Sequence, residues 1–290
     1  MPPIPFYKFH GFGNDYIVIE KSEVTDEIGL PELAKAICRR HTGAGADGIA
    51  IIEKISNGSA DYYCEIVNPD GSYANFSGNG TRCAVSYLYY KKLWTDTFLR
   101  LATRSGVKNF ELLETIADGS YRFRAEIGKP RFSSSAIPLK PRPQGPIESV
   151  IDFPIELGKH TYSVSCVNVG NPVACLFVGD FDLEWRIIGR ELEVHEVFPE
   201  HANIVFVRVI DRENIKLKIW ERGAGETSAS GTCASGAAIL GAFTGRCDRH
   251  VSVHTDGGVT DVVWRDDDEI LLTGRADFAY CGEWPVLIDS

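Results

Sequence analysis

Hydrophobic and polar positions along the chain form short segments that favour strands more often than helices. Several segments are continuous apolar runs, which are typical of strands buried on both faces, and others alternate with a period of two. The spacing predicts strands at residues 16–19, 49–52, 62–67, 121–126, 161–167, 174–178, 203–209, 215–220, 259–264 and 269–273. The sequence therefore predicts a fold in which sheets predominate.

Three segments carry helix signals instead. Residues 31–38 begin with proline in the first turn, where its fixed φ suits a helix. Residues 81–93 form an apolar helix pattern ending in two lysines, which suit the negative end of the helix dipole. A second apolar helix is predicted at 232–243, with Gly245 as its C-terminal cap.

An internal repeat connects these segments. A Gly-Asn pair precedes a strand in each half, and a Ser-Gly dipeptide opens each apolar helix. A polar residue stands nine positions before each of these serines. The landmarks keep their order and a nearly constant offset between the halves: Gly13-Asn14 and Gly170-Asn171, Asn68 and Glu221, Ser77-Gly78 and Ser230-Gly231. An ordered set of this kind indicates duplication, and so two pseudo-equivalent halves.

The length of 290 residues also predicts about two domains. The segment richest in proline, 138–146, is the expected boundary. It divides the chain into an N-terminal half at 1–137 and a C-terminal half that begins at 147. The expected fold class is α/β or α+β.

Composition and charge narrow the function. The chain is 44% hydrophobic and 24% charged, with a net charge of −10. The acidic balance argues against nucleic acid and anionic membranes as partners, because both need clustered positive charge. No apolar run approaches the ~20 residues that span a bilayer, and the N-terminus shows no signal-peptide pattern. Eight cysteines are dispersed singly without a C-x-x-C motif, which favours free buried thiols in a cytoplasmic protein.

Two motifs suggest cofactor or metal chemistry at first sight. Residues 43–48 match G-x-G-x-x-G, but a helix precedes them and a strand follows. A dinucleotide site needs the reverse order, so a glycine-rich turn is expected. His250 and His254 are four residues apart in a β-branched strand pattern, with no further ligand at suitable spacing. The sequence thus favours chemistry without a cofactor or a metal.

The loops that open the two apolar helices carry the functional argument. Free N–H groups at a helix N-terminus bind anions, and the dipole adds positive potential. Two such termini that faced each other across a domain cleft would bind one carboxylate and place Ser77 and Ser230 on opposite faces of it. The alternative is structural: serine is a preferred N-cap residue, and on this interpretation both serines only cap their helices.

Glu221 and Arg222 follow a predicted strand beside this second loop. A charged pair next to glycine-rich backbone suits a zwitterion, with the Glu carboxylate binding ammonium and the Arg guanidinium binding carboxylate. A solvent-exposed ion pair is the structural alternative.

At these loops the sequence resembles the diaminopimelate epimerase family of pyridoxal-independent amino-acid racemases. The matching segments are spread over most of the chain in family order: 9–16, 43–48, 68–83, 169–172, 202–206 and 221–231. The resemblance implies two pseudo-symmetric domains, each with a mixed or antiparallel sheet wrapped around a central buried helix. It also implies that the last strand, at about 277–290, returns to the first domain and that the second domain ends near 276.

The resemblance further implies an amino-acid substrate and a set of site residues. In the family, two cysteines flank the substrate α-carbon, one removing a proton and the other delivering one to the opposite face. These positions fall on Ser77 and Ser230, with Glu221 as a further catalytic position. Asn68, Asn203 and Arg222 would hold the distal amino-acid end, and Gly78, Asn79, Gly231 and Thr232 the reacting carboxylate. Asn14 and Asn171 complete the implied binding set, and a homodimer is the commonest oligomeric expectation.

The departures from the family pattern concern proton transfer. Both cysteine positions carry serine, and Val173 stands where the family has histidine. A thiol has an ordinary pKa near 8.5, so a few per cent is thiolate at neutral pH. If a hydroxyl is about five pKa units weaker, forming its alkoxide costs about 7 kcal/mol more. That difference is on the order of 10⁵ in rate.

Three explanations remain open at this point. The serines are replacements introduced into an epimerase, or they mark a divergent isomerase acting on a more acidic proton, or they mark an amino-acid-binding protein without turnover. The leading expectation is an isomerase of the LL- to meso-diaminopimelate type with impaired or altered proton transfer.

Overall fold

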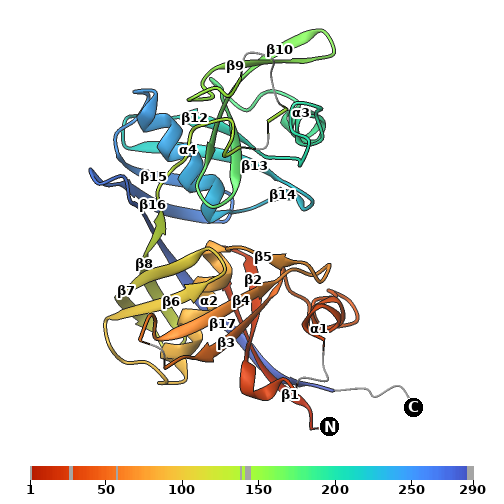
Figure 1. Cartoon of the computed structure of the whole chain (residues 1–290), viewed down its shortest axis with the longest axis vertical. Coiled ribbons are helices and arrows are strands. Elements are labelled where there is room, and N and C mark those ends of the chain that lie inside the picture. The colour runs from red at the N-terminus through yellow and green to blue at the C-terminus, as the bar shows by residue number, and fades with distance from the viewer. Residues whose placement is uncertain (1, 26–28, 57, 138, 141–144, 286–290) are drawn as a thin grey trace. The chain divides into compact units, whose positions relative to one another are not determined.

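The computed structural model describes residues 2–25, 29–56, 58–137, 139–140 and 145–285. The chain divides into two compact units (Figure 1). The first unit comprises residues 1–125 and 273–290, and the second comprises residues 126–272. Two long strands, β8 (Ser120–Gly128) and β17 (Ile270–Trp284), contain the points at which the chain passes from one unit to the other.

The first unit is a closed barrel of eight strands. Strand β17 pairs with β1, the order continues through β2, β3, β4, β6 and β7 to β8, and β8 pairs with β17. The β2–β3 and β4–β6 pairs are parallel, and the short β5 pairs with β4. The bounds are β1 Ile4–Gly11, β2 Asn14–Glu20, β3 Ile49–Lys54, β4 Tyr62–Val67, β5 Tyr73–Ala74, β6 Phe98–Thr103 and β7 Gly106–Ala117.

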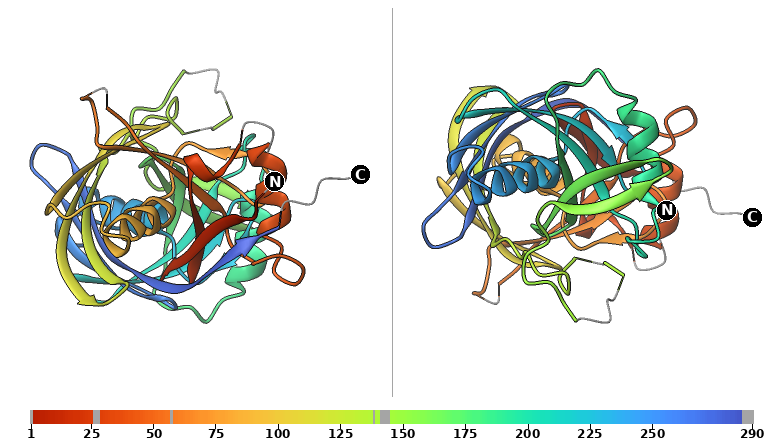
Figure 2. Two further views of the ribbon diagram at one scale, coloured as in Figure 1. Left: turned by 90° about the horizontal axis from the view of Figure 1, so that it is seen from below. Right: turned by 90° about the horizontal axis from the view of Figure 1, so that it is seen from above.

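Helix α2 (Gly78–Tyr90) is the core of this barrel, and its residues from Asn79 to Tyr89 are all buried (Figures 1 and 2). Helix α1 (Leu30–Ile37) covers the outside, where Leu33 and Ile37 pack with Ile17 of β2. Because successive strand residues point to opposite faces, β2 and β3 have apolar contacts on both sides. This double burial explains their continuous apolar runs. A short 3₁₀ helix, η1 (Lys21–Glu23), follows β2.

The second unit repeats the same strand order. Strands β10 to β13, β15 and β16 pair in sequence, with parallel pairs at β11–β12 and β13–β15, and β14 pairs with β13. Strand β9 adds to the edge of β10. The bounds are β9 Phe153–Leu157, β10 His160–Asn168, β11 Pro172–Phe177, β12 Asn203–Val209, β13 Asn214–Glu221, β14 Gly225–Thr227, β15 His250–Thr255 and β16 Gly258–Trp264.

The helices of the second unit repeat as well. Helix α4 (Gly231–Phe243) is buried from Thr232 to Gly241, and α3 (Trp185–Glu193) packs Ile188 and Leu192 onto β12. The matching order of strands and helices confirms two pseudo-symmetric halves, each a mixed sheet around a central buried helix.

The structure corrects several expected bounds. Helix α2 begins at Gly78 rather than residue 81 and ends at Tyr90, because Lys92 has φ +57°, which no helix continues. The elements that the sequence did not predict are helix α3, the 3₁₀ helix η1 and strands β1, β5, β6, β7, β9 and β14. Much of β7 is exposed, so its sequence lacks a clear apolar alternation. Residues 43–48 form the expected turn between α1 and β3, and His254 lies in a strand with Nε2 3.0 Å from Asn214 Oδ1.

The division between units falls at 125/126 and 272/273, whereas the sequence placed it in the proline-rich stretch. Residues 138 and 141–144 of that stretch lie outside the described part of the chain. All eight cysteines are free, as expected; seven are buried, and Cys281 is exposed. Among the helices of the described residues, none combines the length and apolarity needed to cross a membrane.

Candidate functional site

The first candidate site is the start of helix α2. Ser77 is its N-cap residue, with extended backbone, and its Oγ accepts a hydrogen bond from Gly80 N at 3.0 Å. The same Oγ donates to the Tyr16 hydroxyl at 2.9 Å. Ser77 therefore satisfies one of the orphan N–H groups of the helix. Helix geometry leaves the N–H groups of Gly78 and Asn79 to a ligand.

Two amide side chains extend this helix start. Asn79 Nδ2 donates to Asn14 Oδ1 at 3.1 Å, and Asn14 Nδ2 donates to Asp47 Oδ2 at 2.7 Å. At the other end, Arg82 Nη2 donates to Asn79 Oδ1. A cation at one end and a carboxylate at the other fix the orientation of both amides, because a flip would oppose donor to donor and acceptor to acceptor.

Arg82 is an unusual member of this chain of hydrogen bonds. Only 2% of its surface is exposed, and its Nε has no hydrogen-bond partner among the described residues. Complete burial lowers the pKa of Arg82 to about 10, so the guanidinium remains charged at neutral pH. A Cβ at Gly274 would clash with the guanidinium, and glycine at that position therefore makes room for a buried cation behind the helix start.

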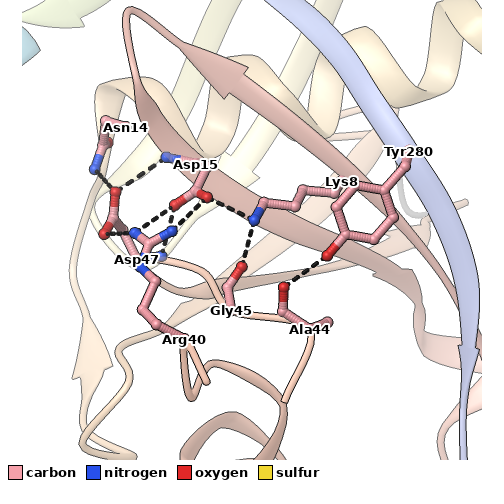
Figure 3. Close-up of polar contacts among 8 residues, drawn as sticks. All are labelled: Lys8, Asn14, Asp15, Arg40, Ala44, Gly45, Asp47 and Tyr280. Carbon is pink, nitrogen blue, oxygen red and sulfur yellow. Dashed lines mark hydrogen bonds and ion pairs between the residues drawn. The ribbon is translucent and has the colours of Figure 1, made fainter. Parts of the chain in front are cut away.

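An ion cluster supports Asn14 from the other side (Figure 3). Arg40 makes a bidentate contact with Asp15 at 2.7 and 2.8 Å and reaches Asp47 at 2.5 Å, and Lys8 lies 2.7 Å from Asp15. Burial opposes ionisation of Asp15, but hydrogen bonds from Arg40 and Lys8 hold its pKa below the usual value. Burial and the neighbouring Asp15 charge raise the pKa of Asp47.

The cluster also fastens the glycine-rich turn to the barrel. Lys8 Nζ donates to Gly45 O at 2.5 Å, and the Tyr280 hydroxyl donates to Ala44 O at 2.6 Å. This cluster was not predicted from the sequence. Two signals for it were present: the glycine-rich turn, which was rejected as a dinucleotide-binding motif, contains Asp47, and Asp15 directly follows the expected site residue Asn14.

The second candidate site is the start of helix α4. Ser230 occupies the N-cap position, but its side chain makes no capping hydrogen bond. Its Oγ instead donates to Glu221 Oε2 at 2.8 Å and lies 3.5 Å from Thr232 Oγ1. Glu221 also accepts from Thr227 Oγ1 at 2.8 Å. The serine hydroxyl is therefore directed at a carboxylate.

Other expected residues hold the surrounding loops. Asn203 accepts from Arg222 N at 3.0 Å and donates to Pro172 O at 3.0 Å, which joins three segments of the second unit. The Arg222 guanidinium is exposed and donates to Glu200 O. Buried Glu193 accepts from Gly223 N and Trp220 Nε1, and so shapes the loop after Glu221.

The expected residues thus fall into separate groups. Asn14, Ser77, Gly78 and Asn79 belong to the α2 helix start, and Glu221, Ser230, Gly231 and Thr232 to the α4 helix start. Asn203 and Arg222 form a third group. Asn68 lies apart from these, with Nδ2 donating to Ser72 Oγ at 2.9 Å. Asn171 makes no side-chain hydrogen bond within the described chain; its carbonyl accepts from Val169 N.

Close packing leaves no room for a side chain at two glycines, Gly236 and Gly48. Val173 is buried, and a Cβ at Gly236 of α4 would lie 2.9 Å from Val173 Cβ. At Gly48, a Cβ would lie 2.7 Å from the Tyr16 ring, so that ring excludes any larger residue there. No group of three or more His, Cys, Asp and Glu suited to a metal occurs among the residues that the structure describes.

The cysteines near the helix starts do not replace the serines. Burial raises the pKa of Cys83 to about 12, and it raises the pKa of Cys233 well above its ordinary value. Both thiols lie inside their helices and are protonated at neutral pH, so neither is poised to act as a base.

Comparison with known proteins gives the family context for this geometry. The sequence profile described as diaminopimelate epimerase matches residues 6–132 and 165–279. The diaminopimelate epimerase of Pelotomaculum thermopropionicum is 38% identical over 284 residues, covering 97% of this chain and 98% of that protein. That of Caldanaerobacter subterraneus subsp. tengcongensis is 39% identical over 280 residues, covering 96% and 98%.

Solved structures share the fold at low sequence identity. A probable proline racemase from Agrobacterium radiobacter has a TM-score of 0.72 at 14% identity, covering 99% of this chain and 93% of that one. A hydroxyproline epimerase from Agrobacterium vitis has a TM-score of 0.72 at 14% identity, covering 97% and 92%.

Proposed function

Because the chain belongs to the diaminopimelate epimerase family, we propose that it interconverts LL- and meso-diaminopimelate by proton transfer at the α-carbon. The chain is an isomerase of this family type; the substrate and the residue roles belong to the proposal. The observation that carries it is the polar arrangement kept at both helix starts, where Ser77 and Ser230 each occupy the N-cap of a buried helix.

In the proposed reaction, the α2 helix start binds a carboxylate of the substrate. The Gly78 and Asn79 N–H groups, the helix dipole and the charge of Arg82 all favour an anion there. The same groups stabilise the negative charge that spreads into the carboxylate as the α-proton leaves. Gly231 and Thr232 supply equivalent backbone donors at the α4 helix start.

The α4 helix start supplies a proton acceptor. Ser230 donates to Glu221, so the carboxylate can receive the serine proton as Oγ becomes basic. A serine alkoxide costs about 7 kcal/mol more than a thiolate if the two acidities differ by about five pKa units. Turnover is therefore proposed to be slow compared with a dithiol enzyme. Asn68, Asn171, Asn203 and Arg222 are assigned to substrate binding.

The weak acidity of the serines favours two further candidates. One is an isomerase of the same fold acting on an amino acid with a more acidic α-proton. The other is an amino-acid-binding protein without turnover, which the regular N-cap geometry of Ser77 would suit. In both, the polar binding residues keep their roles while the proton-transfer step differs.

Incubation of the protein with LL-diaminopimelate, followed by chiral chromatography, tests the proposal. Slow formation of the meso isomer, proportional to enzyme concentration, is expected. Calorimetric titration with LL- and meso-diaminopimelate runs beside it. Binding without interconversion would support the binding protein, and turnover of another amino acid in a panel would support the divergent isomerase. Absence of both binding and turnover for diaminopimelate would remove the substrate assignment.

A further inference from the structure

Each serine at a helix start donates its hydroxyl proton to a side chain that can itself ionise. Ser230 donates to Glu221 at 2.8 Å, and Ser77 donates to the Tyr16 hydroxyl at 2.9 Å. The family resemblance assigns a role to Glu221 and none to Tyr16. We propose that Tyr16 acts through Ser77 as the proton source at the α2 helix start, so that two hydroxyls together do the work of one thiol. This inference rests on the proposed function.

The surroundings of Tyr16 hold its hydroxyl at Ser77. The ring is buried, at 6% exposure, and it packs so closely on Gly48 and Gly80 that a Cβ at either position would lie 2.7–2.9 Å from it. Gly80 N also donates to Ser77 Oγ. The serine oxygen therefore lies between a backbone donor and a phenol, in a position fixed by packing rather than by a mobile loop.

The repeat shows that this pairing is local to the first unit. By the Gly-Asn landmark, the counterpart of Tyr16 is Val173, which has no hydroxyl. Ser230 has its carboxylate partner instead. Two different ionisable partners at equivalent serines indicate that each serine depends on a neighbour for its proton chemistry.

The proposed relay moves two protons. The Ser77 O–H proton passes to the α-carbon, whose carbanion electron pair forms the new C–H bond. The Tyr16 O–H proton passes to Ser77 Oγ, and the negative charge remains on the phenolate oxygen. Both hydroxyl hydrogens must first rotate, which hydroxyl groups do readily. The reverse step removes an α-proton when the phenol is ionised.

The rate that the relay gains follows from the acidity of a phenol, which is greater than that of a serine hydroxyl. A phenol has an ordinary pKa near 10, about 1.5 units above a thiol. A serine acting alone is about five units weaker than a thiol, a factor on the order of 10⁵. With charge left on the phenolate, the deficit falls to about 30-fold. General acid–base residues typically contribute 10²–10⁴-fold to a rate, and the relay lies in this range.

The experiment measures α-deuterium incorporation into LL- and meso-diaminopimelate in D₂O for the unaltered chain and for Tyr16→Phe. We expect Tyr16→Phe to slow exchange by on the order of 10²-fold or more. The alkaline rise in the rate profile of the unaltered chain should vanish in the variant. Tyr62→Phe is the matched control, because Tyr62 is also buried and donates to Leu93 O at 3.3 Å; it should leave the rate unchanged.

The same substitution in a Ser77→Cys/Ser230→Cys background separates the relay from a structural role. A thiol does not need the phenol, so Tyr16→Phe should change that rate less than about threefold. An equal loss in both backgrounds, or no loss in the serine background, would overturn the relay. If the unaltered chain is inert while the dithiol variant turns over, the relay fails and the proposed function stands. Absence of binding and exchange in every form would overturn the proposed function itself.

Discussion

The helix starts at Ser77 and Ser230 occupy equivalent positions of the repeat, yet their surroundings carry opposite charge. Behind Ser77 lies a buried guanidinium, Arg82, that polarises the amides of Asn79 and Asn14. Ser230 donates its hydroxyl proton to the carboxylate of Glu221. The repeat therefore keeps the two helix starts while the side chains around them differ, which matches the proposal that one start holds an anion and the other accepts a proton.

The capping geometry differs in the same sense. Ser77 Oγ accepts from Gly80 N, whereas Ser230 makes no capping hydrogen bond. Helix capping therefore explains one of the two hydrogen bonds of the Ser77 hydroxyl, and it explains no hydrogen bond of the Ser230 hydroxyl. The Ser230 hydroxyl is directed at the Glu221 carboxylate instead, as the proposed proton transfer requires.

The largest expected effect concerns the carboxylate. Glu221→Gln in the unaltered chain should lower kcat/KM for diaminopimelate by about 10²–10⁴-fold, because Ser230 loses the ionised carboxylate that receives its proton. Its repeat counterpart, Asn68→Ala, should act mainly on KM. Steady-state kinetics of both variants checks this; equal effects on kcat would contradict the assignment of proton acceptance to the second helix start.

The next effect concerns stability. The pKa of Arg82, lowered to about 10 from 12.5, corresponds to about 3 kcal/mol held against the charged form by burial. Arg82→Met should therefore unfold in urea at a midpoint equal to or higher than that of the unaltered chain, since apolar replacement of buried charge is often neutral or stabilising. It should nonetheless weaken diaminopimelate binding.

The counterpart of Arg82 in the repeat is Ser235, which donates to Gly231 O at 2.8 Å. Ser235→Ala serves as the control. It should lower the urea midpoint slightly, whereas Arg82→Met should leave the midpoint equal or raise it. A loss of more than about 2 kcal/mol in Arg82→Met would show that the cation stabilises the fold and is not retained for binding.

A smaller difference separates the serines themselves. Ser77→Ala should cost about 1 kcal/mol of unfolding free energy, because it removes a cap from a buried helix. Ser230→Ala removes no cap; its cost of about 1.5–3 kcal/mol should come instead from the lost hydrogen bond to the Glu221 carboxylate, which keeps only its bond from Thr227. Urea denaturation of the two variants gives the comparison, and equal losses would refute the distinction between them.

The smallest effect is a pH dependence of opposite sign at two carboxylates of the first unit. The pKa of Asp15 is lowered in the folded chain, so its contribution to stability is present above pH 3.8 and is lost as pH falls through the lower folded value. The pKa of Asp47 is raised, so its contribution is present below pH 3.8 and is lost as pH rises through the folded value.

Unfolding free energies between pH 2.5 and 6, a range set around the ordinary carboxylate pKa of about 4, test these signs. Asp15→Asn should flatten the rise of stability with pH, and Asp47→Asn should steepen it. At the equivalent position of the repeat, the second unit has Pro172 in place of Asp15. Slopes that change in the same direction would contradict the two assignments.

The sequence predicted the elements whose burial requires a recognisable pattern of apolar residues. The runs at 16–19, 49–52 and 203–209 are apolar because both faces of those strands are covered. The serine landmarks located both helix starts. By contrast, β7 is largely exposed and leaves no apolar pattern, and the start of α2 was placed three residues late because glycines at 78 and 80 weaken the helix signal.

The polar contacts of the site were less predictable. Asp15, Arg40 and Asp47 meet only after the barrel brings β2 next to β3. Pairing of Ser77 with Tyr16 joins residues 61 positions apart. Single-residue patterns do not encode such contacts, whereas the bond from Ser230 to Glu221 spans nine residues across one loop and was within reach of a local interpretation.

The most direct test of the central claim, that Ser77 and Ser230 occupy the two proton-transfer positions, is α-hydrogen exchange of diaminopimelate in D₂O after both serines become cysteine. The account predicts a rise toward the 10⁵-fold that separates thiol from hydroxyl acidity. Ser86→Cys/Ser235→Cys, which adds thiols at buried positions of the same two helices, should give no rise. An equal rate for both double variants and the unaltered chain would contradict the claim.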